Sequence, residues 1–144
     1  MTTNISKIGV VGSGTMGSGI AQACAVAGLD VVMSDISEDQ VQRGLATITA
    51  SLDRLIKREK MTEAEKAATL ARIRVTTSLQ DFADRDLVVE AASENVVVKT
   101  KIFADLDAIL APDAIIATNT SSISITRLAA ATKRPGKVIG MHFF

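Results

Sequence analysis

The sequence carries no net charge, a single cysteine and no long run of apolar side chains. Because 16 lysines and arginines balance 16 aspartates and glutamates, no overall field attracts nucleic acid or an anionic membrane. The lone cysteine, Cys24, excludes an internal disulfide. No apolar run approaches the ~20 residues of a membrane span, and residues 1–6 lack the basic and apolar regions of a secretory signal. These absences indicate a protein of the reducing cytoplasm whose partners are selected by a local site.

The most informative stretch is the segment from Lys7 to Asp35. An apolar run at residues 8–11 leads into three glycines at fixed spacing, and an alanine-rich, helix-like stretch follows and ends near Gly28. A second apolar run, at 31–33, comes just before Asp35. The order of strand, tight turn, helix and strand indicates one βαβ unit. Its turn reads Gly12-Ser13-Gly14-Thr15-Met16-Gly17.

Each glycine of this turn has a physical task that a side chain would prevent. Gly12 allows the sharp turn out of the strand, Gly14 lets the backbone approach a pyrophosphate, and Gly17 lets the helix pack closely on the sheet. The free N–H groups and the positive end of the helix dipole then face the phosphates. Asp35 can accept hydrogen bonds from both hydroxyls of an adenosine ribose, and it would repel a 2′-phosphate. We therefore expect this turn to bind NAD in preference to NADP.

Beyond Asp35, the spacing of apolar residues predicts helices that alternate with buried strands. A long amphipathic helix follows Ser37, and Thr62 with Glu65 caps a second helix, so that the two form a hairpin after the second strand. Strands are expected at 75–76, 87–90, 115–117 and 138–144, a turn or short helix at 79–83, a helix at 96–110 capped by Asn95, and a short helix capped by Ser124. The predicted fold class is α/β, with a Rossmann-type, doubly wound and mostly parallel sheet in one domain over residues 1–144.

Polar residues follow several of these strands, at the edge where open α/β sheets bind their ligands. Besides the glycine turn and Asp35, they include Glu94, Lys99 and the cluster at 119–122. We expect them to converge on one crevice, although turn and capping chemistry explains the serines of the cluster equally well. The only histidine, His142, lies in or just after the last strand. A lone histidine in an apolar setting is more often a core residue than a catalyst, but a parallel last strand would bring it to the same crevice.

A basic cluster lies near the end of the first helix of the hairpin. It consists of Arg54, Lys57, Arg58 and Lys60. One interpretation is a solvated helix face that Asp53 and Glu59 balance, and spacing alone favours it. The other is a landing site for a phosphorylated substrate.

Taken together, these motifs resemble the N-terminal domain of the 3-hydroxyacyl-CoA dehydrogenases, including the bacterial 3-hydroxybutyryl-CoA dehydrogenases. The matching stretches are IGVVGSGTMG at 8–17, VVEA at 88–91, NTSS at 119–122 and GMHFF at 140–144. The resemblance covers essentially the whole chain. It implies NAD as the cofactor, no metal, and oxidation of a (3S)-3-hydroxyacyl-CoA to the 3-ketoacyl-CoA, or the reverse.

The resemblance also implies roles for residues at the reacting end of the crevice. His142 would be the base that takes the proton from the 3-hydroxyl group. Ser121 would hydrogen-bond the reacting oxygen of the acyl-CoA, and Asn119 would help to hold cofactor or substrate beside it. Glu94 and Lys99 match positions that contact the nicotinamide half of the cofactor.

Further from the reaction, the resemblance assigns Asp35 to the adenosine ribose and the helical hairpin to coenzyme A. Ser51 and Arg58 fall where the hairpin of the family meets coenzyme A, and Lys57 belongs to the same basic cluster. This moves the cluster towards the functional interpretation, although the family often has lysine at the position of Arg58.

The family continues beyond the motif at 140–144 into a glutamate that pairs with the histidine and into a helical domain that completes the substrate site and forms a homodimer. We therefore expect this chain to be the cofactor-binding part of such a dehydrogenase and poorly active alone. Two alternatives remain: a dinucleotide-binding module without the reaction, and a dehydrogenase of another small hydroxy acid. Ser121 and His142 favour the dehydrogenase over the module, since cofactor binding alone requires neither.

Overall fold

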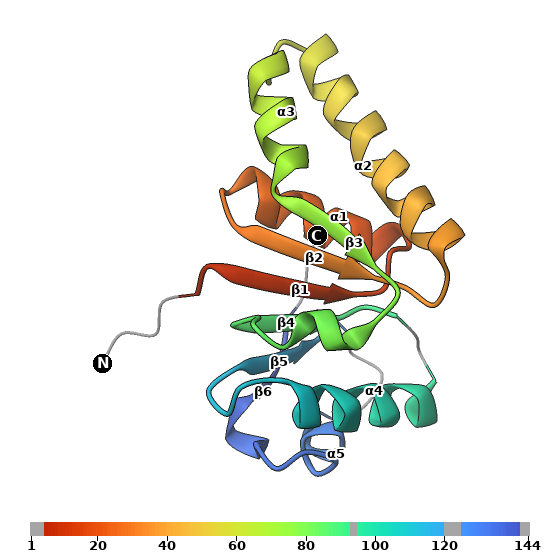
Figure 1. Ribbon diagram of the computed structural model, residues 1–144, viewed down its shortest axis with the longest axis vertical. Coiled ribbons are helices and arrows are strands. Elements are labelled where there is room, and N and C mark those ends of the chain that lie inside the picture. The colour runs from red at the N-terminus through yellow and green to blue at the C-terminus, as the bar shows by residue number, and fades with distance from the viewer. Residues whose placement is uncertain (1–4, 93–94, 120–124, 142–144) are drawn as a thin grey trace.

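The computed structural model of the chain describes residues 5–92, 95–119 and 125–141 (Figure 1). Its strands are β1 (Lys7–Val11), β2 (Asp30–Ser34), β3 (Ile73–Thr76), β4 (Leu87–Glu90), β5 (Ile115–Thr118) and β6 (Val138–Gly140). Its helices are α1 (Thr15–Val26), α2 (Glu38–Lys57), α3 (Glu63–Ala71), α4 (Val96–Ile109) and α5 (Ile125–Ala129), with 3₁₀ turns η1 (Leu79–Phe82) and η2 (Pro135–Lys137). In the described ranges no helix is long and apolar enough to cross a membrane.

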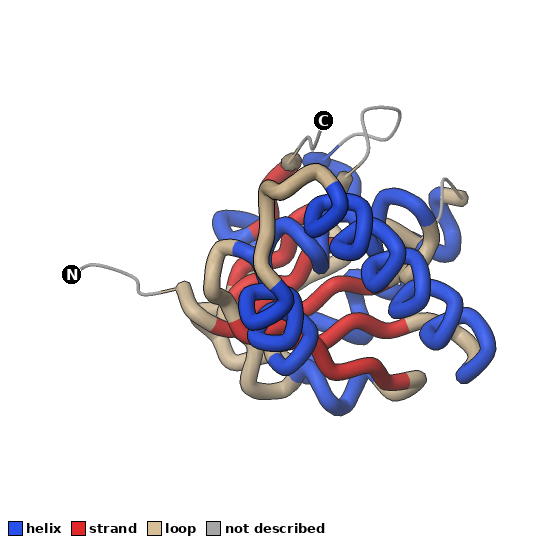
Figure 2. The backbone as a smooth tube through the Cα atoms, turned by 90° about the horizontal axis from the view of Figure 1, so that it is seen from above, coloured by secondary structure: helices blue, strands red, loops and turns tan. Residues whose placement is uncertain are grey.

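The six strands form one sheet in the order β3-β2-β1-β4-β5-β6, and every neighbouring pair is parallel. The predicted Rossmann-type sheet is thereby confirmed. The direction of winding reverses between β1 and β4, so α1 with α2 and α3 lies on one face of the sheet and α4 with α5 on the other (Figures 1 and 2). At this reversal β1 and β4 lead to helices on opposite faces of the sheet, and open α/β sheets bind their ligands beyond the carboxyl ends of the strands at such a point.

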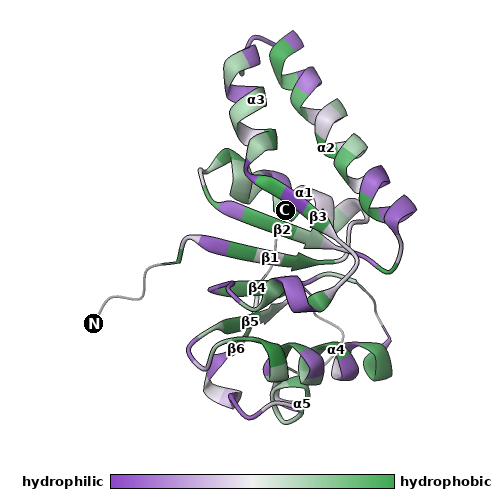
Figure 3. Cartoon of the chain, in the orientation of Figure 1, coloured by the Kyte–Doolittle hydropathy of each residue, from purple (hydrophilic) through white to green (hydrophobic). Residues whose placement is uncertain are grey.

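Two apolar cores, one on each face of the sheet, hold these layers together. Ile20 of α1 with Ile48 and Leu52 of α2 packs against one face, and Phe103 and Leu106 of α4 pack against the other. Most strand residues are accordingly apolar because both faces of a parallel sheet are covered, and Figure 3 shows hydrophilic residues at the starts of β1 and β2 and on the edge strand β3. A fully buried side chain of this size contributes roughly 1.5–3 kcal/mol.

The helix starts follow the predicted capping residues. The Thr62 hydroxyl accepts from the N–H of Glu65 while the Glu65 carboxylate accepts from the N–H of Thr62, which is the expected reciprocal capping box. The Asn95 side chain accepts from the N–H groups of two residues in the first turn of α4. Ser37 caps α2 through the N–H of Gln40. Ser124, predicted to cap α5, lies outside the described residues.

The last strand was predicted over 138–144, of which 142–144 lie outside the described residues. Strand β6 ends at Gly140, which pairs with Thr118, the last residue of β5. One more ladder bond follows, from the Met141 N–H to the Thr118 carbonyl. Because β5 ends there, it offers β6 no further backbone partner among the described residues.

A buried ion pair that the sequence did not predict closes the end of α4. The Arg134 guanidinium donates to the Asp107 carboxylate and to the carbonyls of Leu110, Ala111 and Ala114. Leu110 is the C-cap residue of α4, and Ala111 and Ala114 follow it, so these carbonyls have no partner within the helix. Arg134 therefore acts as a side-chain cap that joins α4 to the approach of β6.

We expect Asp107→Asn to lower the free energy of unfolding by about 1.5–3 kcal/mol at pH 7, because it removes a buried, charge-assisted pair. Burial raises the pKa of Asp107, but the Lys133 N–H and the Arg134 guanidinium outweigh burial and hold this pKa below its usual value. The stabilisation is therefore present above pH ~4 and is lost as pH falls through the lower pKa of the folded state. Urea unfolding should show that the free energy of unfolding falls less between pH 7 and pH 3 in Asp107→Asn than in the wild type. Asp105→Asn, which breaks only the surface pair with Lys101, is the control. Its free energy of unfolding should fall between pH 7 and pH 3 by as much as that of the wild type.

Candidate cofactor site at the glycine turn

The glycine turn lies directly against the loop that follows β4. Gly12 has φ +108°, and a Cβ atom there would lie 2.8 Å from the Ala91 carbonyl oxygen and 2.9 Å from Cα of Ala92. A Cβ on Gly17 would lie 1.9 Å from the Gly12 carbonyl oxygen, so α1 could not pack on the turn with any side chain there. Both predicted tasks, the sharp turn and the close packing of the helix, are visible in the structure.

Gly14 differs, because a Cβ atom there would meet no described heavy atom within 4 Å. Protein packing therefore does not require glycine at this position. Gly14 is the N-cap residue of α1, and no described side chain caps the helix there. The first N–H groups of α1 and its positive dipole end are thus open to an anion. The absence of a side chain at Gly14 leaves room for a ligand to come close to the backbone, which suits a pyrophosphate.

Asp35 stands beside this turn, as predicted, at the end of β2. Its Oδ2 atom accepts from the backbone N–H and the hydroxyl of Ser13, both at 2.8 Å, and its Oδ1 atom accepts from the Ile36 N–H at 2.7 Å. The carboxylate is therefore held against the glycine turn by three donors.

A pocket of about 500 Å³ adjoins Gly14 and Asp35. Its apolar walls come from Ile36, Leu79, Val98 and Ile102. Ile36 is 88% exposed although it is a large apolar residue directly after the acid. An apolar slot beside a carboxylate suits a flat, apolar ring attached to a sugar. None of these wall residues was predicted, and the one signal in the sequence was a large apolar residue, Ile36, directly after Asp35.

At the other end of the crevice, Asn119 follows β5 and donates its backbone N–H to the Glu90 carbonyl. Its side-chain Oδ1 atom is buried and has no hydrogen-bond partner among the described residues. Such an atom is costly unless a donor reaches it, so it points to a ligand with an N–H or O–H group. Ser121, Glu94 and His142, predicted to share this end, lie outside the described residues.

Lys99 is buried beneath this end of the crevice. The residue is only 2% exposed, and its ammonium group pairs with the carboxylate of Glu90, which is fully buried. That carboxylate also accepts from the Thr118 hydroxyl at 3.2 Å and from the Ala92 N–H at 2.8 Å. The group thus joins β4, β5 and α4 at their crevice ends. The prediction that Lys99 contacts the cofactor stays a prediction, and its visible partner is Glu90.

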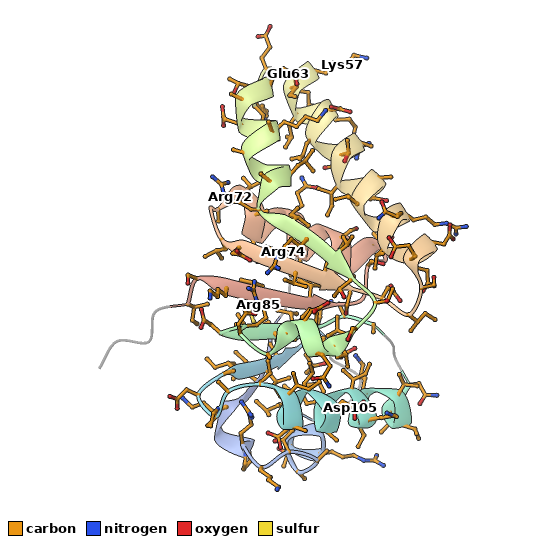
Figure 4. All side chains as sticks on the ribbon, viewed as in Figure 1. Lys57, Glu63, Arg72, Arg74, Arg85 and Asp105 are labelled. Atoms are coloured by element: carbon orange, nitrogen blue, oxygen red, sulfur yellow. The ribbon has the colours of Figure 1, made fainter. Side chains whose placement is uncertain are left out.

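The predicted coenzyme A residues lie elsewhere. Ser51 is half-buried along α2, while Lys57 and Arg58 are exposed at the tip of the α2 and α3 hairpin, far from the sheet (Figure 4). The helix rises about 20 Å between Gly44, which contacts the glycine turn, and Lys57. Asp53, expected to balance the cluster, instead pairs with Lys66 of α3 at 2.5 Å. The structure therefore separates these residues from the glycine turn.

A doubly wound parallel sheet with this turn, an acid after β2 and an apolar pocket between them defines a dinucleotide-binding domain. Residues 7–144 match the family described as "3-hydroxyacyl-CoA dehydrogenase, NAD binding domain". The chain belongs to this family, and NAD is the cofactor that the family binds. The open approach at Gly14, the exposed N-terminus of α1 and the unpaired Asn119 oxygen fit that cofactor.

Named relatives agree with the family. The chain is 52% identical over 143 residues to a 3-hydroxybutyryl-CoA dehydrogenase of Bradyrhizobium diazoefficiens, covering 99% of this chain and 49% of that protein. It is 46% identical over 145 residues to one from Mycobacterium tuberculosis, covering 100% of this chain and 51% of the relative. The crystal structure of (S)-3-hydroxybutyryl-CoA dehydrogenase PaaH1 from Ralstonia eutropha superposes with a TM-score of 0.96 at 60% identity, covering 98% of this chain and 50% of that one. The chain thus spans about half the length of these relatives.

Gly14→Ala should separate cofactor binding from folding. Because its new Cβ meets no described protein atom, the free energy of unfolding should change by less than about 1 kcal/mol. The methyl group would stand where the pyrophosphate approaches, so NADH affinity should fall at least about tenfold. Urea unfolding and calorimetric titration with NADH measure the two effects. Gly19→Ala, on the exposed side of α1 with equal room, is the matched control, and unchanged NADH affinity in Gly14→Ala would contradict the assignment.

Proposed function

We propose that the chain is the cofactor-binding half of an NAD-dependent 3-hydroxyacyl-CoA dehydrogenase. The whole enzyme would oxidise a (3S)-3-hydroxyacyl-CoA to the 3-ketoacyl-CoA, a reaction of fatty acid oxidation, or run it in reverse. The observation that carries the proposal is the Asp35 carboxylate fixed between the glycine turn and the apolar pocket. The names of the relatives supply the substrate class.

The adenosine half of NAD would use the described part of the crevice. Adenine would lie in the pocket beside Ile36 and Val98, where burial of its faces is favourable. The ribose hydroxyls would donate to Asp35. The pyrophosphate would take the open N–H groups at the start of α1, next to Gly14. A 2′-phosphate would meet the Asp35 carboxylate instead, which disfavours NADP.

The reacting half depends on residues proposed from the family resemblance. Bound NAD supplies the acceptor of the hydride. His142 would take the proton from the 3-hydroxyl group, since a histidine accepts protons near neutral pH. Ser121 would hydrogen-bond the same oxygen, and Asn119 would donate from its amide or accept at its free Oδ1 atom. Glu94 and Lys99 would line the nicotinamide side, with Lys99 held by Glu90.

Coenzyme A would be held by the hairpin. Ser51, Lys57 and Arg58 lie along one helix end, and the basic side chains there form no ion pair with a described carboxylate. Unpaired cations suit the phosphates of coenzyme A. Under the same proposal the chain is the N-terminal domain of a cytoplasmic homodimer whose second domain forms the dimer and completes the substrate site.

Replacing both Lys57 and Arg58 by alanine tests the coenzyme A site. Affinity for acetoacetyl-CoA in the presence of saturating NADH should fall by about tenfold or more, because charge-assisted contacts to phosphate are lost. NADH affinity should not change, since the hairpin tip is remote from the glycine turn.

The matched control replaces Arg43 and Lys101 by alanine, which removes equal charge from exposed helix faces elsewhere. Calorimetric titration measures both ligands. Unchanged acetoacetyl-CoA affinity in Lys57→Ala/Arg58→Ala would count against the hairpin and would favour a dehydrogenase of another small hydroxy acid.

A further inference from the structure

The hydrogen bonds around Asp35 leave it short of acceptor sites for a ribose. A carboxylate offers about four lone-pair positions. Three donors lie within hydrogen-bond distance of it: the Ser13 N–H and hydroxyl at Oδ2, and the Ile36 N–H at Oδ1. An adenosine ribose brings two hydroxyl donors, so one of the three bonds must be released if both hydroxyls are to bind. This conflict rests on the proposed function, in which Asp35 receives the ribose.

Only the Ser13 hydroxyl can be released without moving the backbone, because the other two donors are amides. A second acceptor is already in place for it, since the Gln40 carbonyl of α2 lies 2.9 Å from the Ser13 Oγ atom. One hydroxyl hydrogen can serve only one of these acceptors at a time. Rotation about the C–O bond is therefore enough to move the donation from Asp35 to Gln40.

Packing keeps the Ser13 Oγ atom between the Asp35 carboxylate and the Gln40 carbonyl. Ser13 is 5% exposed. Helix α2 presses on it through Gly44, where a Cβ atom would lie 2.7 Å from the Ser13 carbonyl oxygen and 2.8 Å from its Cβ atom. Because Ser13 is nearly buried and packs closely against α2, rotation of the hydroxyl hydrogen is the smallest change that redirects its donation.

We propose that Ser13 tunes NAD affinity by competing with the ribose for the Asp35 carboxylate. In the free protein its hydroxyl donates to Oδ2, and on binding it turns to the Gln40 carbonyl and gives up that lone pair to a ribose hydroxyl. Binding thus exchanges a charge-assisted hydrogen bond for a weaker neutral one, and Ser13 lowers the affinity. The orientation of the carboxylate survives this exchange because the Ser13 and Ile36 amides still hold it.

Ser13→Ala tests this competition by calorimetric titration of the full chain with two probes. NADH should bind about three- to tenfold tighter than to the wild type, because no hydroxyl has to be displaced. An NADH analogue that lacks the 2′-hydroxyl of the adenosine ribose needs one lone pair only, and the fourth position supplies it. Its affinity should be the same in Ser13→Ala and the wild type.

Two further variants make the test specific. Ser18→Ala removes a buried hydroxyl that donates to the Thr15 carbonyl in the same helix and does not contact Asp35, so NADH affinity should not change. In an Asp35→Ala background, Ser13→Ala should have no effect, since its action runs through the carboxylate. Ser13→Gly, which also lacks the hydroxyl, replaces Ser13→Ala if circular dichroism shows that the latter is unfolded.

Equal or weaker NADH binding by Ser13→Ala would overturn the proposal, as would an equal gain for the 2′-deoxy analogue. The outcome for the proposed function is read separately, from Asp35→Ala alone. If that variant binds NADH as tightly as the wild type, Asp35 does not hold the ribose and both ideas fail. If it binds NADH more weakly while Ser13→Ala shows no gain, only the role of Ser13 is lost.

Discussion

The close approach of three backbone segments at the glycine turn is the constraint on which the site depends. The loop after β4, the start of α1 and the middle of α2 all contact the turn at distances that leave no room for a Cβ atom on Gly12, Gly17 or Gly44. Protein interiors are packed densely, so a shift of one segment would move the others. The Asp35 carboxylate takes its position from this junction through Ser13, and one wall of the adjoining pocket comes from the loop after β4.

A buried polar group supports the other end of the crevice. Glu90 and Lys99 are charged and almost inaccessible to solvent. The attraction within such a pair offsets the free-energy cost of desolvation only when the remaining hydrogen bonds of both groups are made. Thr118 and the Ala92 N–H contribute those bonds. The same group fixes the start of the loop that packs on Gly12. The end of the crevice at Asp35 and the end at Asn119 are therefore joined through β4, which lies beside β1 in the middle of the sheet.

The fold was predictable because its signals are local. Glycine spacing, the Thr62 and Glu65 capping box and the apolar runs each depend on residues that are close in sequence, and the structure confirms them. The pocket walls were not predictable, since Ile36, Leu79 and Ile102 meet only when the loop after β2, the turn η1 and helix α4 are brought to one sheet edge. Lys99 was identified as a site residue, but its pairing with Glu90 depends on which way a long side chain turns, and spacing does not encode that direction. The separation of Lys57 from the glycine turn likewise follows from the direction of α2.

The central claim is that Asp35 and the glycine turn bind the adenosine half of NAD. The most direct test is a calorimetric titration of the chain with NADH and, separately, with NADPH. Saturable NADH binding with much weaker NADPH binding is the expected result, because the carboxylate accepts from ribose hydroxyls and repels a 2′-phosphate. Equal binding of the two, or no binding of either by a chain that circular dichroism shows to be folded, would contradict this account of the site.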